Sequence, residues 1–221
     1  MVLTRKKEKA FTILGHHVNA FETLDDIDFN QLDIVINLAG EPIADKRWSK
    51  AQKQKIESSR WHITEQITDK INAADNPPHT FISGSAIGYY GRQTEPVDEQ
   101  HNQPFDEYSH YLCKQWETLA NKAQSDKTRV CILRTGVVLA KHGGALKKMV
   151  PPFLFCLGGP IADGTQQMSW IHINDMVNII LFLIENKSLN GVFNATAPNP
   201  VSNYQFSESL SETLEKPNFF R

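Results

Sequence analysis

The sequence has little of what marks membrane, secreted or nucleic-acid-binding proteins. Its longest apolar run, Ile179 to Ile184, is far shorter than the roughly 20 residues that cross a bilayer. The net charge is -2, so no basic excess offers a surface to nucleic acid or to anionic membranes. Near the N-terminus, Arg5 interrupts the chain before a signal-peptide core can form. We therefore expect a cytoplasmic protein with no nucleic-acid partner and no membrane partner.

Cysteine is scarce as well. The three cysteines, Cys113, Cys131 and Cys156, are odd in number and far apart in sequence. This pattern suits reduced thiols and matches no zinc-binding spacing, so we expect no metal site. The chain does have 40% hydrophobic residues over 221 positions, which is enough for one sizeable core.

Short β-favouring runs alternate with helical stretches along the chain. The run Asp33–Gly40 is rich enough in Ile, Val and Leu to predict a strand buried on both faces, as in a parallel sheet. The helix that follows begins at Ser49, which can form a capping box with Gln52, and Pro77 stops it. Isoleucines at spacings of seven and four, from Ile56 to Ile71, form its apolar stripe. The alternation predicts a doubly wound α/β sheet. Further strands are expected at His17–Phe21, His79–Ser83, Arg129–Arg134 and Gly191–Ala195, and further helices at Arg5–Leu14, Tyr108–Gln124, from Asn174 or Asp175, and from Ser202. The buried stripe of the helix from Asn174 or Asp175 is expected to consist of Met176, Val177, Ile180, Leu181 and Ile184.

The stretch Phe81–Gly91 is the best candidate for a site. An apolar run there passes into glycines, two serines and two tyrosines. Ligands collect at the carboxyl ends of strands in open parallel sheets, so Ser85 and its neighbours are candidate ligand contacts. A tight turn that needs backbone freedom would explain the same residues.

Two other strand ends suit a nucleotide. The small residues of Asn37–Gly40 would let an adenosine or ribose lie against the backbone, although such residues after a strand are common. Arg5, beside Thr4 and also after a strand end, can accommodate a 2′-phosphate, whereas an acidic residue would suit a free hydroxyl. A solvated basic turn is the alternative for this second segment.

Taken in order, these motifs resemble those of a known family. The matching segments are Asn37–Ile43, Ser59–Arg60, Ser83–Gly91, Trp116–Glu117, Arg134–Val138, Leu157–Ile161 and Trp170–Asp175. They are similar to the extended short-chain dehydrogenase/reductase superfamily, in particular its atypical "epimerase family" subgroup of NAD(P)-dependent epimerases and dehydratases, over nearly the whole chain. The resemblance implies a Rossmann-like fold, NADP as the cofactor, and a nucleotide sugar or other small carbonyl or alcohol compound as substrate. It implies cofactor contacts from Thr4, Arg5, Leu38, Ala39, Arg60 and Val138.

The resemblance also implies a division of the chain. Residues 1–140 would be a partial dinucleotide-binding domain. Residues 141–221, where glycines and prolines punctuate short segments, would be a cap or substrate region interleaved with remaining sheet elements. A homodimer is left open.

One departure from the family concerns phosphate binding. The superfamily opens with a strand and a glycine-rich turn that holds the pyrophosphate, and no such turn occurs in this sequence. We interpret the chain as a fragment or as one with a mis-assigned start codon. It should lack a central strand and the main phosphate site, and we expect a segment encoding the turn upstream of Met1.

The second departure concerns catalysis. The usual pair is a tyrosine with a lysine four residues later, but Tyr108 is followed at that spacing by Leu112 and Tyr111 by Gln115. Aligned on Trp116–Glu117, the pair falls on Ser109 and Cys113. Ser85 matches the family's Ser/Thr position, so we expect any catalysis to depend on Ser85.

Two other classes of function stay open. A non-catalytic dinucleotide-binding or regulatory protein is favoured by the missing Tyr/Lys pair. A serine hydrolase would use Ser85 with His110 or His172, but the sequence around Ser85 fails the G-x-S-x-G pattern. We expect His172 to have a local role beside a helix cap, and Arg134 to be a buried ion-pair partner.

Overall fold

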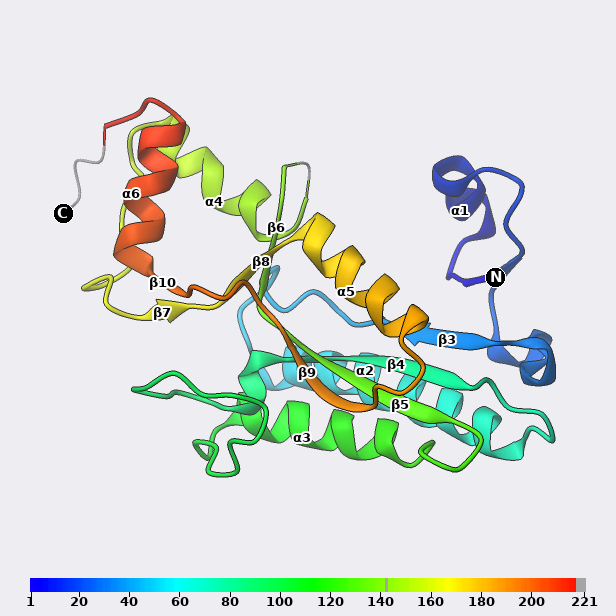
Figure 1. The fold of residues 1–221 in the computed structure, drawn as a ribbon. Coiled ribbons are helices and arrows are strands. Elements are labelled where there is room, and N and C mark those ends of the chain that lie inside the picture. The colour runs from blue at the N-terminus through cyan, green and yellow to red at the C-terminus, as the bar shows by residue number, and fades with distance from the viewer. Residues whose placement is uncertain (142, 218–221) are drawn as a thin grey trace.

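The centre of the fold is a parallel sheet of four strands. The computed structural model describes residues 1–141 and 143–217, and Figure 1 shows the sheet between two layers of helices. Because the strands run parallel, their carboxyl ends share one edge, where Ser85 pairs with Arg134 and Arg134 pairs with Asn194. The predicted α/β sheet is confirmed. Its strands, in spatial order, are β3 (Ile34–Asn37), β4 (Thr80–Ala86), β5 (Arg129–Thr135) and β9 (Gly191–Ala195).

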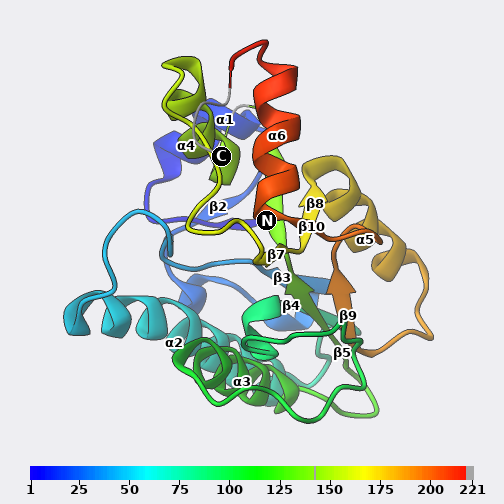
Figure 2. The same ribbon diagram turned by 90° about the vertical axis from the view of Figure 1, so that its left-hand side faces the viewer.

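Helices cover both faces of the sheet. Figures 1 and 2 show α2 and α3 together on one face and α5 on the other. Successive residues of β4 face opposite cores, since side chains alternate along a strand. Phe81 packs in one cluster with Ile71 of α2, and Ile82 packs in another with Leu183 of α5. The three helices are α2 (Lys50–Ala73), α3 (Tyr108–Asn121) and α5 (Ile173–Glu185).

Helix α2 begins at the predicted cap, but only one half of the expected capping box forms, because the N–H of Ser49 donates to the carbonyl of Arg47. The side chain of Ser49 accepts a hydrogen bond from the backbone N–H of Gln52 and so satisfies one free donor of the first turn. Ile56, Ile67 and Ile71 are buried along one stripe of the helix. This stripe holds α2 against the sheet and against α3, where Trp61 donates from Nε1 to the carbonyl of Leu112.

The N-terminal strands stand apart from the central sheet. β1 (Val2–Leu3) pairs in parallel with β2 (Ala20–Phe21), and α1 (Lys7–Leu14) connects them. Strand β3 therefore has β4 as its one strand partner in the described chain, and 44% of Ile36 is exposed. The prediction that the Asp33–Gly40 strand is buried on both faces is wrong because β3 lies at the edge of the sheet.

The C-terminal region adds helices and two short strand pairs outside the central sheet. Its helices α4 and α6 contact each other and lie on the opposite side of Figure 1 from α1. Ser202 and Gln205 form the expected capping box at the start of α6. Strand β9 of the same region joins the central sheet, and the division at residue 140 stays a prediction. The elements are β6 (Val137–Ala140) paired with β8 (Trp170–His172), β7 (Gln167–Met168) paired with β10 (Val201–Ser202), α4 (Gly144–Leu154) and α6 (Asn203–Thr213).

Helix α5 differs from its prediction in two ways. It begins at Ile173, because Nδ1 of His172 accepts from the N–H of Asn174 at 3.2 Å and makes His172 the N-cap. Val177 and Leu181, expected in the buried stripe, are 46% and 49% exposed. The helix faces the sheet with its other side, through Met176 and Leu183. None of the helices within residues 1–141 and 143–217 is both long enough and apolar enough to span a membrane.

We predict that truncation of two paired isoleucines has unequal costs. Ile36 and Ile82 are partners on adjacent strands, but Ile82 is fully buried whereas Ile36 is 44% exposed. Ile82→Ala should lower the free energy of unfolding by about 2–5 kcal/mol, and Ile36→Ala by less than about 1 kcal/mol. Urea denaturation measures both values. Equal losses would mean that another segment covers β3 in solution.

Candidate functional site

The candidate site lies at the carboxyl edge of the central sheet, where the register aligns Ser85, Arg134 and Asn194 on three strands. Ser85 was expected in a loop after a strand ending at Ser83. It lies instead within β4, because Gly84, Ser85 and Ala86 continue the pairing with β5. Only 5% of Ser85 is exposed. The strand therefore holds this hydroxyl in a fixed position.

The hydroxyl of Ser85 is directed at a carboxylate. Its Oγ donates to Oε1 of Glu117 on α3 at 2.6 Å. No local sequence pattern connects Glu117 with Ser85, so the sequence does not predict this contact. The one signal in the sequence is the resemblance of Trp116–Glu117 to the family motif.

Glu117 in turn forms a buried ion pair with Arg134, as expected for this arginine. Arg134 donates from Nε to Oε1 at 2.9 Å and from Nη2 to Oε2 at 2.8 Å. Only 4% and 7% of the two side chains are exposed. Burial opposes the charge of Arg134, but the hydrogen bonds with Glu117 outweigh burial and raise the pKa of the arginine. The charge of Arg134 is therefore retained in the core.

Two tyrosines complete the surroundings of Arg134. Its Cζ lies 3.4 Å from the ring centroid of Tyr89 and 4.9 Å from that of Tyr90. The Tyr90 hydroxyl donates to Oδ1 of Asn194 at 2.7 Å, so the turn after β4 is tied to β9. Within the described residues, Nη1 of Arg134 is buried without a hydrogen-bond partner. Stacking on the rings partly offsets that cost.

The positions that align with the usual Tyr/Lys pair lie beside the turn after β4. A methyl group added to Gly88 would lie 3.2 Å from Cβ of Ser109 and 3.6 Å from Sγ of Cys113. Burial raises the pKa of Cys113 to about 11, so its thiol is protonated at neutral pH. Burial also raises the pKa of Tyr108, whereas an activated phenol needs a lowered one. Tyr111 is 54% exposed and packs edge-on against Trp61.

The histidines considered for a hydrolase have other partners. A ring nitrogen of His110, Nδ1, lies 2.6 Å from the carbonyl oxygen of Tyr89, and His172 caps α5. The hydroxyl of Ser85 donates to Glu117. The geometry around Ser85 therefore offers no support to a Ser–His arrangement. No cluster of three metal-ligating side chains occurs among the residues described.

The loop after β3 is held by its own strand and by α2. Oδ1 of Asn37 accepts from the N–H of Ala39 at 3.1 Å, and Nη1 of Arg60 donates to the carbonyl of Glu41 at 3.0 Å. A methyl group on Gly40 would lie 2.8 Å from Cζ of Arg60, so the glycine allows this close approach. Burial lowers the pKa of Arg60. Leu38 is 52% exposed and is free to contact a ligand.

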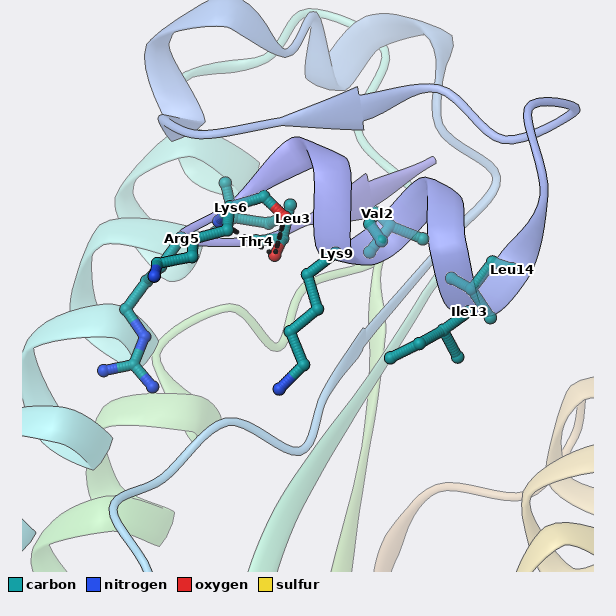
Figure 3. A pocket seen from close by; sticks show the side chains of 9 residues that line it. Val2, Leu3, Thr4, Arg5, Lys6, Lys9, Ile13 and Leu14 are labelled. Atoms are coloured by element: carbon teal, nitrogen blue, oxygen red, sulfur yellow. Dashed lines mark hydrogen bonds between the residues drawn. The ribbon is translucent and has the colours of Figure 1, made fainter.

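Thr4 and Arg5 line a separate cavity of about 670 Å³ in the N-terminal unit, which consists of β1, α1 and β2. Oγ1 of Thr4 accepts from the N–H of Lys6 at 3.2 Å and fixes the turn into α1. Figure 3 shows the side chains of Arg5 and Lys9 extending on the same side of α1. Lys9 was not singled out from the sequence, although it lies one helical turn beyond Arg5. Lys6 and Lys9 also line the cavity, and the other lining residues are Val2, Leu3, Ala10, Ile13 and Leu14.

Val138 lies on β6, just beyond the carboxyl end of β5, and pairs with Ile171. It is half-buried and packs against the core cluster on the α5 side of the sheet. The structure thus places Leu38, Ala39, Ser85 and Val138 after or at the carboxyl ends of strands. Arg60 joins the first two through Gly40, and Thr4 and Arg5 lie in the separate N-terminal unit.

Comparison with known proteins shows one consistent family. A sequence profile of the NAD dependent epimerase/dehydratase family matches residues 4–196. An epimerase family protein of Arabidopsis thaliana, the chloroplastic homolog of SDR39U1, is 41% identical over 187 residues, which are 84% of this chain and 53% of the relative. An epimerase family protein of Mycobacterium leprae is 38% identical over 84% of this chain and 60% of its own length. The chain thus spans little more than half of these relatives.

Solved structures agree with this result. The human epimerase family protein SDR39U1 (isoform 2), solved with NADPH, has a TM-score of 0.85 and 31% identity, covering 91% of this chain and 69% of its own. A nucleoside-diphosphate sugar epimerase from Corynebacterium glutamicum has a TM-score of 0.70 and 33% identity, covering 82% and 39%. UDP-glucuronic acid 4-epimerase from Bacillus cereus, solved with NAD, shares the fold at a TM-score of 0.76 and 19% identity, covering 96% and 71%.

We predict that thiol labelling distinguishes Cys113 from Cys156. Cys113 is buried with a pKa raised to about 11, and burial also raises the pKa of buried Cys131, so both stay protonated at pH 8. Cys156 is partly exposed. Ellman's reagent under native conditions should therefore react with one thiol, and a Cys156→Ser variant should react with none. Rapid labelling of Cys113 at pH 8 would contradict the burial seen beside Ser85.

Proposed function

This chain belongs to the NAD dependent epimerase/dehydratase family, and we propose that it functions as an NADP-binding oxidoreductase. Its substrate would be a small carbonyl or alcohol compound such as a nucleotide sugar. The observation that carries the proposal is the group of cations around the cavity after β1. Arg5, Lys6 and Lys9 all line this cavity, and none forms an ion pair within the described residues. Such a group suits the 2′-phosphate that distinguishes NADP from NAD. The human relative was solved with NADPH.

The loop after β3 fits the middle of the dinucleotide. Leu38 and Ala39 offer an exposed apolar side chain and a small one, against which a ribose can lie. Arg60 forms no ion pair with a carboxylate within the described chain. Its guanidinium group lies beside the backbone of Gly40. With Thr4, Arg5 and Val138, these residues would hold the cofactor.

Ser85 would act on the substrate. When bound, the nicotinamide ring would supply the redox chemistry by accepting or giving a hydride. Ser85 lies at the carboxyl edge of the sheet, on a rigid strand, where its oxygen can hydrogen-bond the alcohol or carbonyl group that reacts. No tyrosine of the site has a lysine four residues later to lower its pKa. Ser85 is therefore the side chain on which turnover should depend.

A non-catalytic dinucleotide-binding or regulatory protein is the second candidate, favoured by the missing Tyr/Lys pair. The two are distinguished by the nicotinamide absorbance with a panel of nucleotide sugars and secondary alcohols. A change in absorbance identifies an enzyme. NADP binding without any change favours a sensor. Location in the cytoplasm and assembly as a homodimer stay predictions.

We predict that Arg5 selects NADP over NAD. A charge-assisted hydrogen bond to the 2′-phosphate is worth about 1.5 to 3 kcal/mol, so Arg5→Ala should weaken NADP binding about 10- to 100-fold and leave NAD binding almost unchanged. Calorimetric titration of both nucleotides measures the difference. Lys7→Ala is the matched control, since Lys7 is a neighbouring cation that does not line the cavity. Equal affinities for NADP and NAD in the parent protein would refute the proposal.

We also predict that Ser85→Ala lowers turnover about 10²-fold or more while NADP affinity stays the same, because the lost hydroxyl contacts the reacting group and not the cofactor phosphates. Ser83→Ala is the control: Ser83 is buried on the same strand, and its Oγ donates to the carbonyl of Gly84. Tyr108→Phe and Tyr111→Phe should each have much smaller effects. Loss of turnover in Tyr111→Phe would instead mean that this phenol is the activated group.

A further inference from the structure

The buried cluster at the carboxyl edge of β4 determines which way the hydroxyl of Ser85 points. Oγ of Ser85 and Oε1 of Glu117 are 2.6 Å apart. An ionised carboxylate has no proton to give and is an acceptor only, so the proton between the two oxygens belongs to Ser85. The two hydrogen bonds from Arg134 reach both oxygens of Glu117, and because a guanidinium offers only donors, both oxygens act as acceptors.

This arrangement leaves Ser85 with lone pairs but no proton for a ligand. A serine hydroxyl has one donor, and Glu117 accepts it. The Cys113 thiol also lies within hydrogen-bond reach of Ser85 and can occupy one lone pair of Oγ. A hydroxyl group of a ligand could donate to the other lone pair. A carbonyl group in the same position would bring two acceptors together, and such an unpaired contact is unfavourable.

We propose that Ser85 recognises the substrate in its alcohol form, as an acceptor from a substrate hydroxyl, and that Glu117 and Arg134 are positioning residues that impose this polarity. The inference refines the proposed function, on which its relevance to turnover rests. It identifies the ligand group that contacts Ser85 as a hydroxyl. It also gives the buried ion pair a role in ligand selection beyond its contribution to stability.

Glu117→Gln is the variant that should remove this fixed polarity without changing the volume of the side chain. In the parent, Oε1 of Glu117 accepts from both Ser85 and Nε of Arg134, whereas Oε2 accepts from Nη2. The amide of a glutamine can place either its oxygen or its NH2 group at the position of Oε1, with one mismatched contact to Arg134 in each orientation. Ser85 is then no longer held as a donor to residue 117. The variant should therefore lose the parent's preference for an alcohol ligand.

The first experiment compares cyclohexanol and cyclohexanone as probes of matched shape. Binding is followed in the full chain by the backbone amide signals of Ser85 to Ile87. We expect the parent to bind the alcohol about tenfold more tightly than the ketone, and Glu117→Gln to lose most of that preference. General destabilisation would weaken both probes and would not change the ratio of their affinities. Equal binding by the parent, or an unchanged ratio in Glu117→Gln, would overturn the inference.

The second experiment needs no variant of the ion pair, which guards against poor folding of Glu117→Gln. In the parent protein, the hydroxyl proton of Ser85 should exchange slowly with water and show a nuclear Overhauser effect to the side chain of Glu117. The signal should be absent in Ser85→Ala and retained in Ser83→Ala. A Ser85 hydroxyl proton that exchanges as fast as that of an exposed serine would overturn the inference.

Neither experiment contains NADP. The inference about Ser85 can therefore fail while the proposed NADP-dependent function holds, and the reverse is also possible. A chain that discriminates alcohol from ketone but does not bind NADP would support the polarity of Ser85 and refute the NADP-dependent function. Conversely, NADP-dependent turnover with no discrimination between the two probes would support the function and refute the polarity.

Discussion

The ion pair between Glu117 and Arg134 connects the parts of the structure that form the site. It joins α3 to β5, and through Ser85 it also reaches β4. A buried ion pair adds little net stability compared with apolar residues, but removal of one partner leaves a charge in the core, at a cost of about 3–5 kcal/mol. The helix and the two strands therefore have to keep their relative positions. This requirement holds Ser85 at the edge of the sheet.

The pair also explains how the site can lack the tyrosine and lysine that its superfamily usually carries. In that mechanism a lysine lowers the pKa of a phenol. Here Cys113 is the residue that aligns with the lysine, and burial raises its pKa to about 11, so its thiol stays neutral and brings no charge. The charges near Ser85 are instead those of Glu117 and Arg134, and they neutralise each other. Such an environment orients a hydroxyl more readily than it activates a phenol.

The remaining site residues are spread over separate units. Leu38, Ala39 and Arg60 gather at the end of β3, whereas Thr4 and Arg5 belong to the small β1–β2 pair. The exposed side chain of Ile36 lies on the free edge of β3. An apolar edge strand with unpaired backbone groups is costly in water and tends to acquire a partner. The residues proposed to bind the cofactor would act together only if β3 and the β1–β2 pair keep fixed positions relative to each other.

The sequence by itself determined the local elements, because their signals lie within a few residues. Hydrophobic spacing predicted α2, and β9 has the bounds expected from Gly191–Ala195. Ser49 and Ser202 cap their helices as predicted. The family motifs also identified the fold, and the buried pairing of Arg134 was foreseen. These features depend on residue type and near neighbours alone.

Only the tertiary structure decided which distant residues meet. The contacts of Ser85 with Glu117 and of Arg60 with Gly40 depend on strand order, register and the packing of α2 and α3 on the sheet. The exposure of Ile36 likewise follows from the place of β3 at the edge, since an apolar run has the same sequence pattern in a central strand as in an edge strand. Periodicity records which residues prefer burial. It does not record which segments are present to bury them.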